Sequence, residues 1–185
     1  MVLITKNDPL AVGSRLPAFR LSDTLDAEIT DELVYARRPR GLVVAFTCNH
    51  CPYVMSYERR FLDLARITLP RGISWLAVNS NAANPNYGDD SVEKMKSRVR
   101  ANNYPFPYAP DLLQDVARSF GAACTPEFFL FDDERRLRYT GRLDDDQDES
   151  RVKTRYLAEA IEDLLAARVI RRDRSHPIGC SIKWL

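Results

Sequence analysis

Short apolar runs alternate along this chain with segments whose apolar residues recur at helical spacing. Residues 42–46, Leu-Val-Val-Ala-Phe, form a continuous apolar run with two β-branched side chains, which is typical of a buried central strand. Over residues 51–67 the apolar positions instead recur every three or four residues, which predicts a helix with one buried face. Pro52 is compatible with this helix because it lies in the first turn, where its missing N–H costs nothing. A buried strand is therefore expected to lead directly into an amphipathic helix.

The same alternation continues to residue 167 and predicts the rest of the fold. Residues 104–110 contain three prolines and cannot form a regular helix, so they are expected to be an extended connector. Asp89 and Asp90 are expected to cap a polar helix that ends near residue 101. The other expected elements are strands at 73–78, 127–131 and 137–141, the last two forming a hairpin, and helices at 112–120 and 153–167. Together they predict an α/β fold in which a central mixed β-sheet is flanked by helices.

Length and composition limit the classes of protein to which this chain can belong. Its 185 residues are expected to form a single domain, residues 1–185, that ends in a basic tail at residues 168–185. The 27 basic and 26 acidic residues nearly cancel, so no strong field favours nucleic acid. No apolar run approaches the roughly 20 residues of a membrane-spanning helix, so no membrane partner is expected. The first residues lack the apolar core of about 7–15 residues that a signal peptide has, which predicts a cytoplasmic protein.

Cys48-Asn49-His50-Cys51 lies where the predicted strand passes into the helix. In a reducing cytoplasm, cysteines are more often catalytic, metal-bound or simply buried than joined in structural disulfides. Unpaired N–H groups and the helix dipole stabilise negative charge at a helix N-terminus, which favours a thiolate there. Cys48 is expected to be the more exposed sulfur and to attack, with Cys51 resolving the mixed disulfide. His50 is expected either to favour the thiolate when it is protonated or to be a solvated loop residue.

Cys124 and Cys180 lie outside this motif, and three interpretations of them stay open. They form a second dithiol pair that relays electrons to Cys48 and Cys51, or all four cysteines bind one Zn²⁺ ion, or both are small buried hydrophobic side chains. The zinc interpretation is weakened because structural zinc sites usually combine two closely spaced pairs, whereas this chain has one. The predicted active site therefore contains no metal.

These motifs resemble those of the thioredoxin-like redoxins of the AhpC/TSA superfamily, and within it a bacterial subgroup described as peroxiredoxin-like. The similarity extends over about residues 13–167. The strand at 42–46 followed by Cys-Asn-His-Cys-Pro is similar to the family's catalytic corner. Thr125-Pro126 looks like the threonine and cis-proline that face the CxxC motif in thioredoxin folds. The opening motif of the family resembles Gly13, Pro17, Phe19, Leu21 and Asp23.

The resemblance implies a thioredoxin-like fold in which Thr125 and Pro126 hold the backbone of a substrate against the attacking sulfur. The sequence also departs from the patterns of the family. Thr47 stands where thioredoxins usually have a tryptophan before the first cysteine. The peroxiredoxin pattern fails as well, because aligning Cys51 with the peroxidatic cysteine puts Cys48 at its threonine and Pro126 at its activating arginine. These departures weaken a peroxidase interpretation.

The function expected from these observations is thiol–disulfide oxidoreduction by Cys48 and Cys51. The substrate is expected to be a thiol or disulfide, of a protein in the first place or of a small molecule, and a reductase is needed to recycle the disulfide. One alternative is an antioxidant thiol peroxidase in which Cys51 takes the oxygen, Cys48 resolves the sulfenic acid and Arg142 approaches from the hairpin. Another is a non-enzymatic protein that binds metal through its cysteines. No organic cofactor is expected, because no glycine-rich dinucleotide loop is present.

Overall fold

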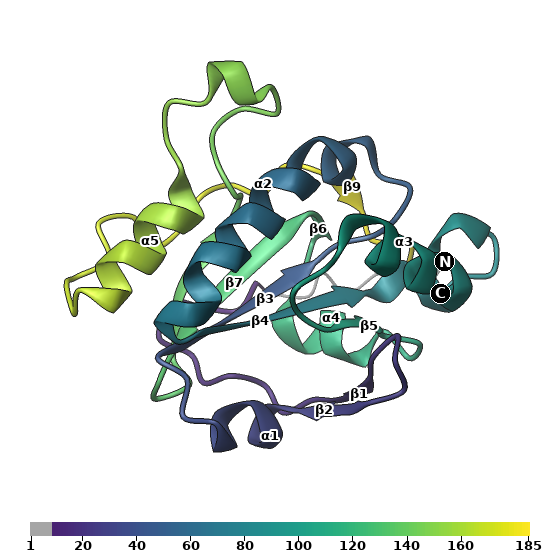
Figure 1. Ribbon diagram of the computed structural model, residues 1–185, viewed down its shortest axis with the longest axis horizontal. Coiled ribbons are helices and arrows are strands. Elements are labelled where there is room, and N and C mark those ends of the chain that lie inside the picture. Colours follow the sequence, from purple (N-terminus) through teal and green to yellow (C-terminus); the bar gives the residue numbers. More distant parts are fainter. Residues whose placement is uncertain (1–8) are drawn as a thin grey trace, which may run out of the picture.

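A five-stranded mixed β-sheet forms the centre of the computed structural model, which describes residues 9–185 (Figure 1). Its strands lie in the order β5-β4-β3-β7-β8. β3, β4 and β5 are parallel, whereas β7 runs antiparallel to both β3 and β8. The expected α/β class with a mixed sheet is therefore confirmed. The strands span Gly41–Phe46 (β3), Ile73–Asn79 (β4), Tyr108–Pro110 (β5), Glu127–Asp132 (β7) and Leu137–Gly141 (β8).

Helices cover both faces of this sheet (Figure 1). One face packs against α2, α3 and α5, and the other against α4 and the N-terminal segment. No helix within residues 9–185 combines the length and the apolar character needed to span a membrane. The helices span Asp31–Ala36 (α1), Pro52–Thr68 (α2), Val92–Asn102 (α3), Asp115–Phe120 (α4) and Tyr156–Leu165 (α5). Short 3₁₀ helices span Leu69–Arg71 (η1), Ser80–Ala83 (η2), Gly88–Asp90 (η3) and Glu149–Arg151 (η4).

β3 illustrates how the sheet is buried on both faces. Alternate side chains of a strand point to opposite faces. Accordingly, Val43 and Ala45 pack with residues of α2 and α5, whereas Leu42, Val44 and Phe46 pack with residues of α4. All five are at most 1% exposed, and burying a valine, leucine or phenylalanine stabilises the fold by about 1.5–3 kcal/mol each. This strand therefore holds the residues that follow its carboxyl end in a fixed position.

The expected elements are present, and the differences at their ends have physical reasons. α3 is capped by Ser91, whose hydroxyl accepts a hydrogen bond from the Lys94 N–H, and not by Asp89 or Asp90. The proline-rich segment is extended as expected, and its end adds β5 to the edge of the sheet. Two short strands, β1 (Arg20–Ser22) and β2 (Glu28–Thr30), and the helix α1 were not expected, because three-residue strands are too short to show a periodic pattern.

The C-terminal tail returns to the body of the protein. β9 (Cys180–Ser181) pairs antiparallel with β6 (Cys124–Thr125), which directly precedes Pro126. Beyond β9, Ile182 is only 3% exposed, and the guanidinium of Arg118 lies 4.6 Å from the ring centre of Trp184. The tail is thus packed beside the loop that faces the start of α2 (Figure 1).

Candidate active site

Cys48 and Cys51 lie where β3 passes into α2. Cys51 is the N-cap residue of the helix, with an extended backbone (φ −74°, ψ 124°), and Pro52 lies in the first turn. The predicted succession of buried strand, cysteine motif and helix is therefore confirmed. Both cysteines are buried, with 1% of Cys48 and 0% of Cys51 exposed. Exposure therefore does not distinguish the two sulfurs, and the expectation that Cys48 is the more exposed one is not supported.

The loop before β7 faces the two sulfurs, as the resemblance implied. The peptide bond between Thr125 and Pro126 is cis. The Sγ atom of Cys48 lies 3.2 Å from the hydroxyl of Thr125, and that of Cys51 lies 3.3 Å from the carbonyl oxygen of the same residue. The structure thus brings together four of the residues singled out in the sequence, Cys48, Cys51, Thr125 and Pro126.

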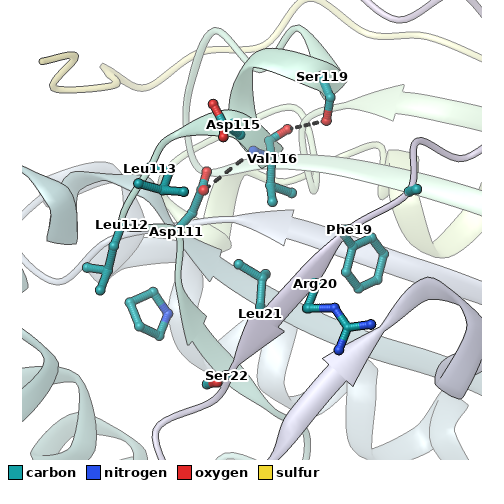
Figure 2. Close-up of a pocket in the computed structure, with 12 residues that line it drawn as sticks. Phe19, Arg20, Leu21, Ser22, Asp111, Leu112, Leu113, Asp115, Val116 and Ser119 are labelled. Atoms are coloured by element: carbon teal, nitrogen blue, oxygen red, sulfur yellow. Dashed lines mark hydrogen bonds between the residues drawn. The ribbon is translucent and has the colours of Figure 1, made fainter.

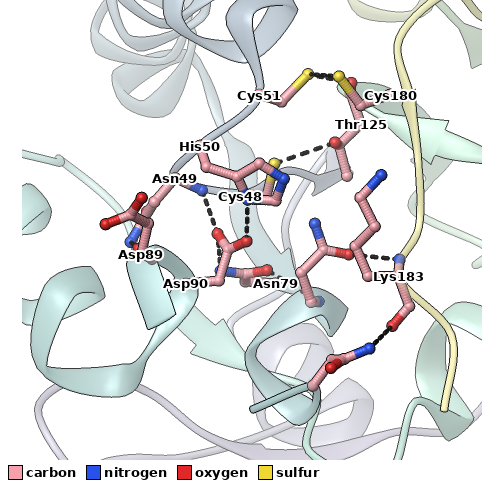
Figure 3. A network of polar contacts seen from close by, with 12 residues as sticks. Cys48, Asn49, His50, Cys51, Asn79, Asp89, Asp90, Thr125, Cys180 and Lys183 are labelled. Atoms are coloured by element: carbon pink, nitrogen blue, oxygen red, sulfur yellow. Dashed lines mark hydrogen bonds and ion pairs between the residues drawn. The ribbon is translucent and has the colours of Figure 1, made fainter. Parts of the chain in front are cut away.

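His50 is held by a buried carboxylate instead of lying free in solvent (Figure 3). Its Nδ1 atom pairs with Oδ2 of Asp90, and its ring stacks on that of Tyr87 with the centroids 5.2 Å apart. Asp90 is 0% exposed and also accepts hydrogen bonds from the N–H of Asn49 (2.5 Å) and the side-chain amide of Asn79 (3.2 Å). A buried carboxylate needs such partners, because leaving it unpaired costs free energy. The interpretation of His50 as a solvated loop residue therefore does not hold.

Asp90 is a site residue that the sequence pattern does not reveal. It lies 41 positions from Asn49, and in the sequence it looks like a helix cap. One signal was present. Ser91 suffices to cap the following helix, which leaves the acidic pair before it without a local role.

The two sulfurs have different electrostatic surroundings. Hydrogen bonds from the thiols of Cys48 and Cys180 and from the N–H of Val54 lower the pKa of Cys51 and outweigh the opposing effect of burial. The pKa of Cys48 is raised by its hydrogen bond to Cys51 and by burial, and the carboxylate of Asp90 adds to the increase. Unpaired N–H groups at the start of α2 favour negative charge on the N-cap residue in the same sense. The thiolate is thus favoured on Cys51 and disfavoured on Cys48.

The tail brings Cys180 to the active site but leaves Cys124 outside it. The Sγ atoms of Cys180 and Cys51 lie 2.7 Å apart (Figure 3). In the β6–β9 ribbon, Cys180 pairs with Thr125 and Cys124 pairs with Ser181. Because neighbouring residues of a strand point to opposite faces, Cys124 and Cys180 lie on opposite faces of the ribbon. The contacts therefore do not support a second redox pair made of these two cysteines.

Cys124 lies instead beside a buried carboxyl group. Glu127 is 4% exposed and accepts a hydrogen bond from the N–H of Ala123 at 2.7 Å. Burial raises the pKa of Glu127 to about 7. Burial, together with this carboxyl group, raises the pKa of Cys124 to about 12. A thiol with such a pKa is unreactive at neutral pH, which favours the interpretation of Cys124 as a small buried hydrophobic residue.

The four cysteines do not come together as a zinc site in residues 9–185. The group of possible ligands that does form consists of Cys48, His50 and Asp90, whose ligand atoms lie within 4.8 Å of one another. In this group His50 and Asp90 are paired with each other, and Asp90 already accepts two further hydrogen bonds. The interpretation of the four cysteines as a zinc site is therefore not supported.

A separate pocket of about 520 Å³ lies between β1, β5 and α4 (Figure 2). None of the residues that line it is a cysteine or a histidine. Its buried carboxylate, Asp111, is satisfied within the protein by the hydroxyl of Ser80 and the N–H of Ala117. This pocket is not a candidate for the redox site.

Comparison with known proteins agrees with this geometry. The family model for redoxins matches residues 11–156, which include both cysteines of the motif and the facing loop. The chain belongs to the redoxin family. This redoxin is similar to the crystal structure of a hypothetical protein from Sinorhizobium meliloti 1021, with 33% identity, a TM-score of 0.89 and coverage of 96% of this chain and 97% of that chain. It is also similar to an uncharacterized conserved protein from Geobacillus kaustophilus, with 36% identity, a TM-score of 0.87 and coverage of 95% and 93%.

More distant structures show that the redoxin has a thioredoxin-like fold. The peroxidoxin BcpB from Mycobacterium tuberculosis is 18% identical, with a TM-score of 0.64 and coverage of 85% of this chain and 97% of that chain. No match was found among curated proteins. The resemblance to thioredoxin-like redoxins of the AhpC/TSA superfamily is thus confirmed, and membership of the redoxin family supports a redox function in general.

Proposed function

We propose that this redoxin is a thiol–disulfide oxidoreductase in which Cys48 and Cys51 alternate between dithiol and disulfide. The juxtaposition of the two sulfurs with one residue of the facing loop carries the proposal, since Thr125 lies 3.2 Å from one sulfur and 3.3 Å from the other. Two thiols at the start of a helix, one of them with a lowered pKa, are suited to reversible disulfide exchange.

Cys51 is the attacking sulfur in this proposal. Its thiolate attacks a disulfide of the substrate, one sulfur of the substrate leaves as a thiolate, and a mixed disulfide forms on Cys51. Cys48 then attacks the sulfur of Cys51, the second substrate sulfur leaves, and the Cys48–Cys51 disulfide remains. These roles are the reverse of those expected from the sequence, because both sulfurs are buried and the thiolate is favoured on Cys51.

Cys48 must lose its proton before it can resolve the mixed disulfide. A ring nitrogen of His50 lies within 4.8 Å of the Cys48 sulfur, and such distances commonly shorten once substrate is bound. Asp90 holds Nδ1 of the same ring. We assign His50 as the acceptor of the Cys48 proton and Asp90 as the residue that positions His50.

A thiol or a disulfide is the substrate of this reaction, and a separate reductase recycles the oxidised protein. The identity of both, and a cytoplasmic location, stay predictions. The recycling step is needed because each turnover that reduces a substrate leaves the Cys48–Cys51 pair oxidised.

A thiol peroxidase is the second candidate, because the lowered pKa of Cys51 also suits attack on a peroxide. Such an attack needs hydrogen-bond donors around the peroxide oxygens. Arg142 was the expected donor, but its guanidinium lies over the ring of Tyr156, 5.4 Å from the centroid. Disulfide exchange is therefore the stronger candidate.

Single-turnover kinetics distinguish the two reactions. The reduced protein is mixed with oxidised glutathione or with hydrogen peroxide, quenched by acid, alkylated and mapped by mass spectrometry. We expect oxidised glutathione to produce the Cys48–Cys51 disulfide, and peroxide to react no faster than it does with a free thiol. Rapid oxidation by peroxide, with a sulfenic acid trapped on Cys51, would replace the proposal by the peroxidase. Cys124→Ser is the control and is expected to react as the wild-type protein does.

A further inference from the structure

A third sulfur lies against the redox motif. The Sγ atom of Cys180 is 2.7 Å from that of Cys51, although the two residues are 129 positions apart. The thiol of Cys48, in the same motif, also acts on Cys51 and lowers its pKa. The sulfur of Cys51 therefore responds to a thiol of its own motif and contacts a thiol of the tail.

The tail is anchored on both sides of Cys180, so this contact is built into the fold. Before it, the N–H of Ser175 donates to the carbonyl of Thr140 at 3.0 Å. After it, the N–H of Lys183 donates to Oδ1 of Asn81 at 2.8 Å, and the side-chain amide of Gln114 donates to the carbonyl of Lys183 at 2.9 Å. Cys180 itself pairs with Thr125, the residue that contacts both sulfurs of the motif.

Among the four cysteines, Cys180 is the most accessible. Cys48, Cys51 and Cys124 are buried, whereas Cys180 is partly exposed. A disulfide in solution therefore has a more open route to the sulfur of the tail than to the buried pair. The tail strand β9 also occupies the edge of β6, which is the backbone edge next to Pro126.

We propose that Cys180 is a third catalytic thiol of this redoxin, which exchanges with Cys51 so that a Cys51–Cys180 disulfide is a second oxidised state of the enzyme. This inference rests on the proposed function, because the exchange starts from the oxidised Cys48–Cys51 pair. In that state Cys51 no longer holds a thiolate beside Cys180.

The step balances as a thiol–disulfide exchange. The thiolate of Cys180 attacks the sulfur of Cys51, the Cys51–Cys180 bond forms, and the Cys48–Cys51 bond breaks. Cys48 leaves as a thiolate and takes up a proton, while Cys180 has given one up, so no outside oxidant or reductant is consumed. The reverse step returns the oxidised state to Cys48–Cys51 and frees Cys180 to meet a thiol or disulfide from solution.

Pairwise cysteine variants test the exchange directly. The Cys48→Ser, Cys124→Ser double variant keeps Cys51 and Cys180, whereas Cys51→Ser, Cys124→Ser keeps Cys48 and Cys180. Both are treated with oxidised glutathione, quenched with acid, alkylated and mapped without reduction. We expect an internal Cys51–Cys180 disulfide in the first variant, in a yield about ten-fold or more above that of any internal disulfide in the second, because exchange needs contact between the sulfurs.

The same mapping of the wild-type protein separates this inference from the proposed function. Detection of both the Cys48–Cys51 and the Cys51–Cys180 disulfides supports both claims. A Cys48–Cys51 disulfide without any Cys51–Cys180 disulfide, together with a first variant that stops as a mixed disulfide with glutathione, overturns the role of Cys180 and leaves the oxidoreductase intact. Absence of the Cys48–Cys51 disulfide contradicts the proposed function itself.

Gly179→Ala provides a test that keeps every cysteine. A Cβ atom at Gly179 would lie 2.1 Å from the carbonyl oxygen of Thr125, so the tail strand must shift away from the loop. Formation of the Cys51–Cys180 disulfide is expected to slow by about ten-fold or more, since exchange requires the sulfurs in line and in contact. Gly88→Ala is the control, because a Cβ atom there meets nothing within 4 Å. Equal rates in the two variants would overturn the inference.

Discussion

The two cysteines of the motif are three residues apart and equally buried, yet they face different parts of the molecule. Cys48 faces a polar network centred on the buried carboxylate of Asp90. Cys51 caps a helix and contacts a sulfur of the C-terminal tail. A negative charge beside Cys48 opposes its thiolate, whereas the helix N-terminus and two thiols favour the thiolate on Cys51. The two sulfurs therefore differ in their surroundings, and not in their exposure, and the roles proposed for them rest on that difference.

Removing one sulfur at a time is expected to have the largest effect and to show directly how Cys48 and Cys51 differ. Cys51→Ser is expected to lower the rate of exchange with oxidised glutathione about a hundred-fold or more, because the favoured thiolate is lost. The thiols of Cys48 and Cys180 that remain have raised pKa values. Cys48→Ser is expected to retain a first attack at a rate close to that of the wild-type protein. Stopped-flow rates under single-turnover conditions measure both. The opposite order, with Cys48→Ser the more damaging, would return the attacking role to Cys48.

Glu127→Gln distinguishes the titration of the buried carboxyl group of Glu127, at the start of β7, from that of the cysteine thiols. Burial raises the pKa of Glu127 to about 7, so between its ordinary value and 7 the folded state holds a proton that the unfolded state has released. Its contribution to stability is therefore fully present at low pH and is lost as the pH rises toward and past 7. The free energy of unfolding of the wild-type protein is therefore expected to fall by at most roughly 3 kcal/mol from this cause.

Glutamine stays neutral and keeps a carbonyl for the N–H of Ala123. Urea unfolding of wild type and Glu127→Gln at several pH values is expected to show the variant gaining relative stability as the pH rises from about 5 to 8. Glu134→Gln, on the exposed turn of the hairpin, is the control. A difference between wild type and Glu127→Gln that does not change with pH would contradict the buried carboxyl as the cause.

Asp90→Asn is expected to reduce the difference in pKa between Cys48 and Cys51. Removing the carboxylate is expected to lower the pKa of Cys48, because a nearby negative charge opposes its thiolate. The pH dependence of thiolate absorbance in the Cys51→Ser background measures the change. Asp89→Asn is the matched control, since Asp89 is the exposed neighbour. An unchanged titration of Cys48 would mean that Asp90 does not act on this sulfur.

Thr125→Val is expected to have the smallest effect. The threonine hydroxyl lies 3.2 Å from the sulfur of Cys48 and opposes the increase in its pKa. Losing one such hydrogen bond costs about 1 kcal/mol, so the resolving step is expected to slow by about five-fold. Thr125→Ser keeps the hydroxyl and is expected to restore the rate. If serine fails to restore it, the effect of valine comes from the shape of the side chain instead of the hydrogen bond.

The pattern of apolar and polar residues predicts those parts of the molecule whose structure depends on residues close to one another in the sequence. The apolar run of β3 and the periodicity of α2 were sufficient to locate the motif, and the resemblance correctly placed Thr125 and Pro126 opposite it. Both depend on contacts that recur along a strand or a helix, or on a motif that is short in sequence.

The rest of the site depends on contacts between distant residues, for which the sequence carries no local signal. Asp90 reaches Asn49 across 41 positions, and Cys180 reaches Cys51 across 129. Exposure of Cys48 was misjudged for the same reason, because the residues that cover it come from other segments. The N-terminal hairpin was missed because its strands, of three residues each, are too short to show alternation.

A redox titration of the wild-type protein tests whether Cys51 is oxidised to an internal disulfide. The protein is equilibrated in buffers of reduced and oxidised glutathione, quenched with acid, and mapped by mass spectrometry without reduction. We expect Cys51 to be oxidised in one reversible two-electron step to an internal disulfide, which it forms with Cys48 or, after exchange, with Cys180. Independent oxidation of Cys48 and Cys51, each ending as a separate mixed disulfide with glutathione, would contradict this expectation.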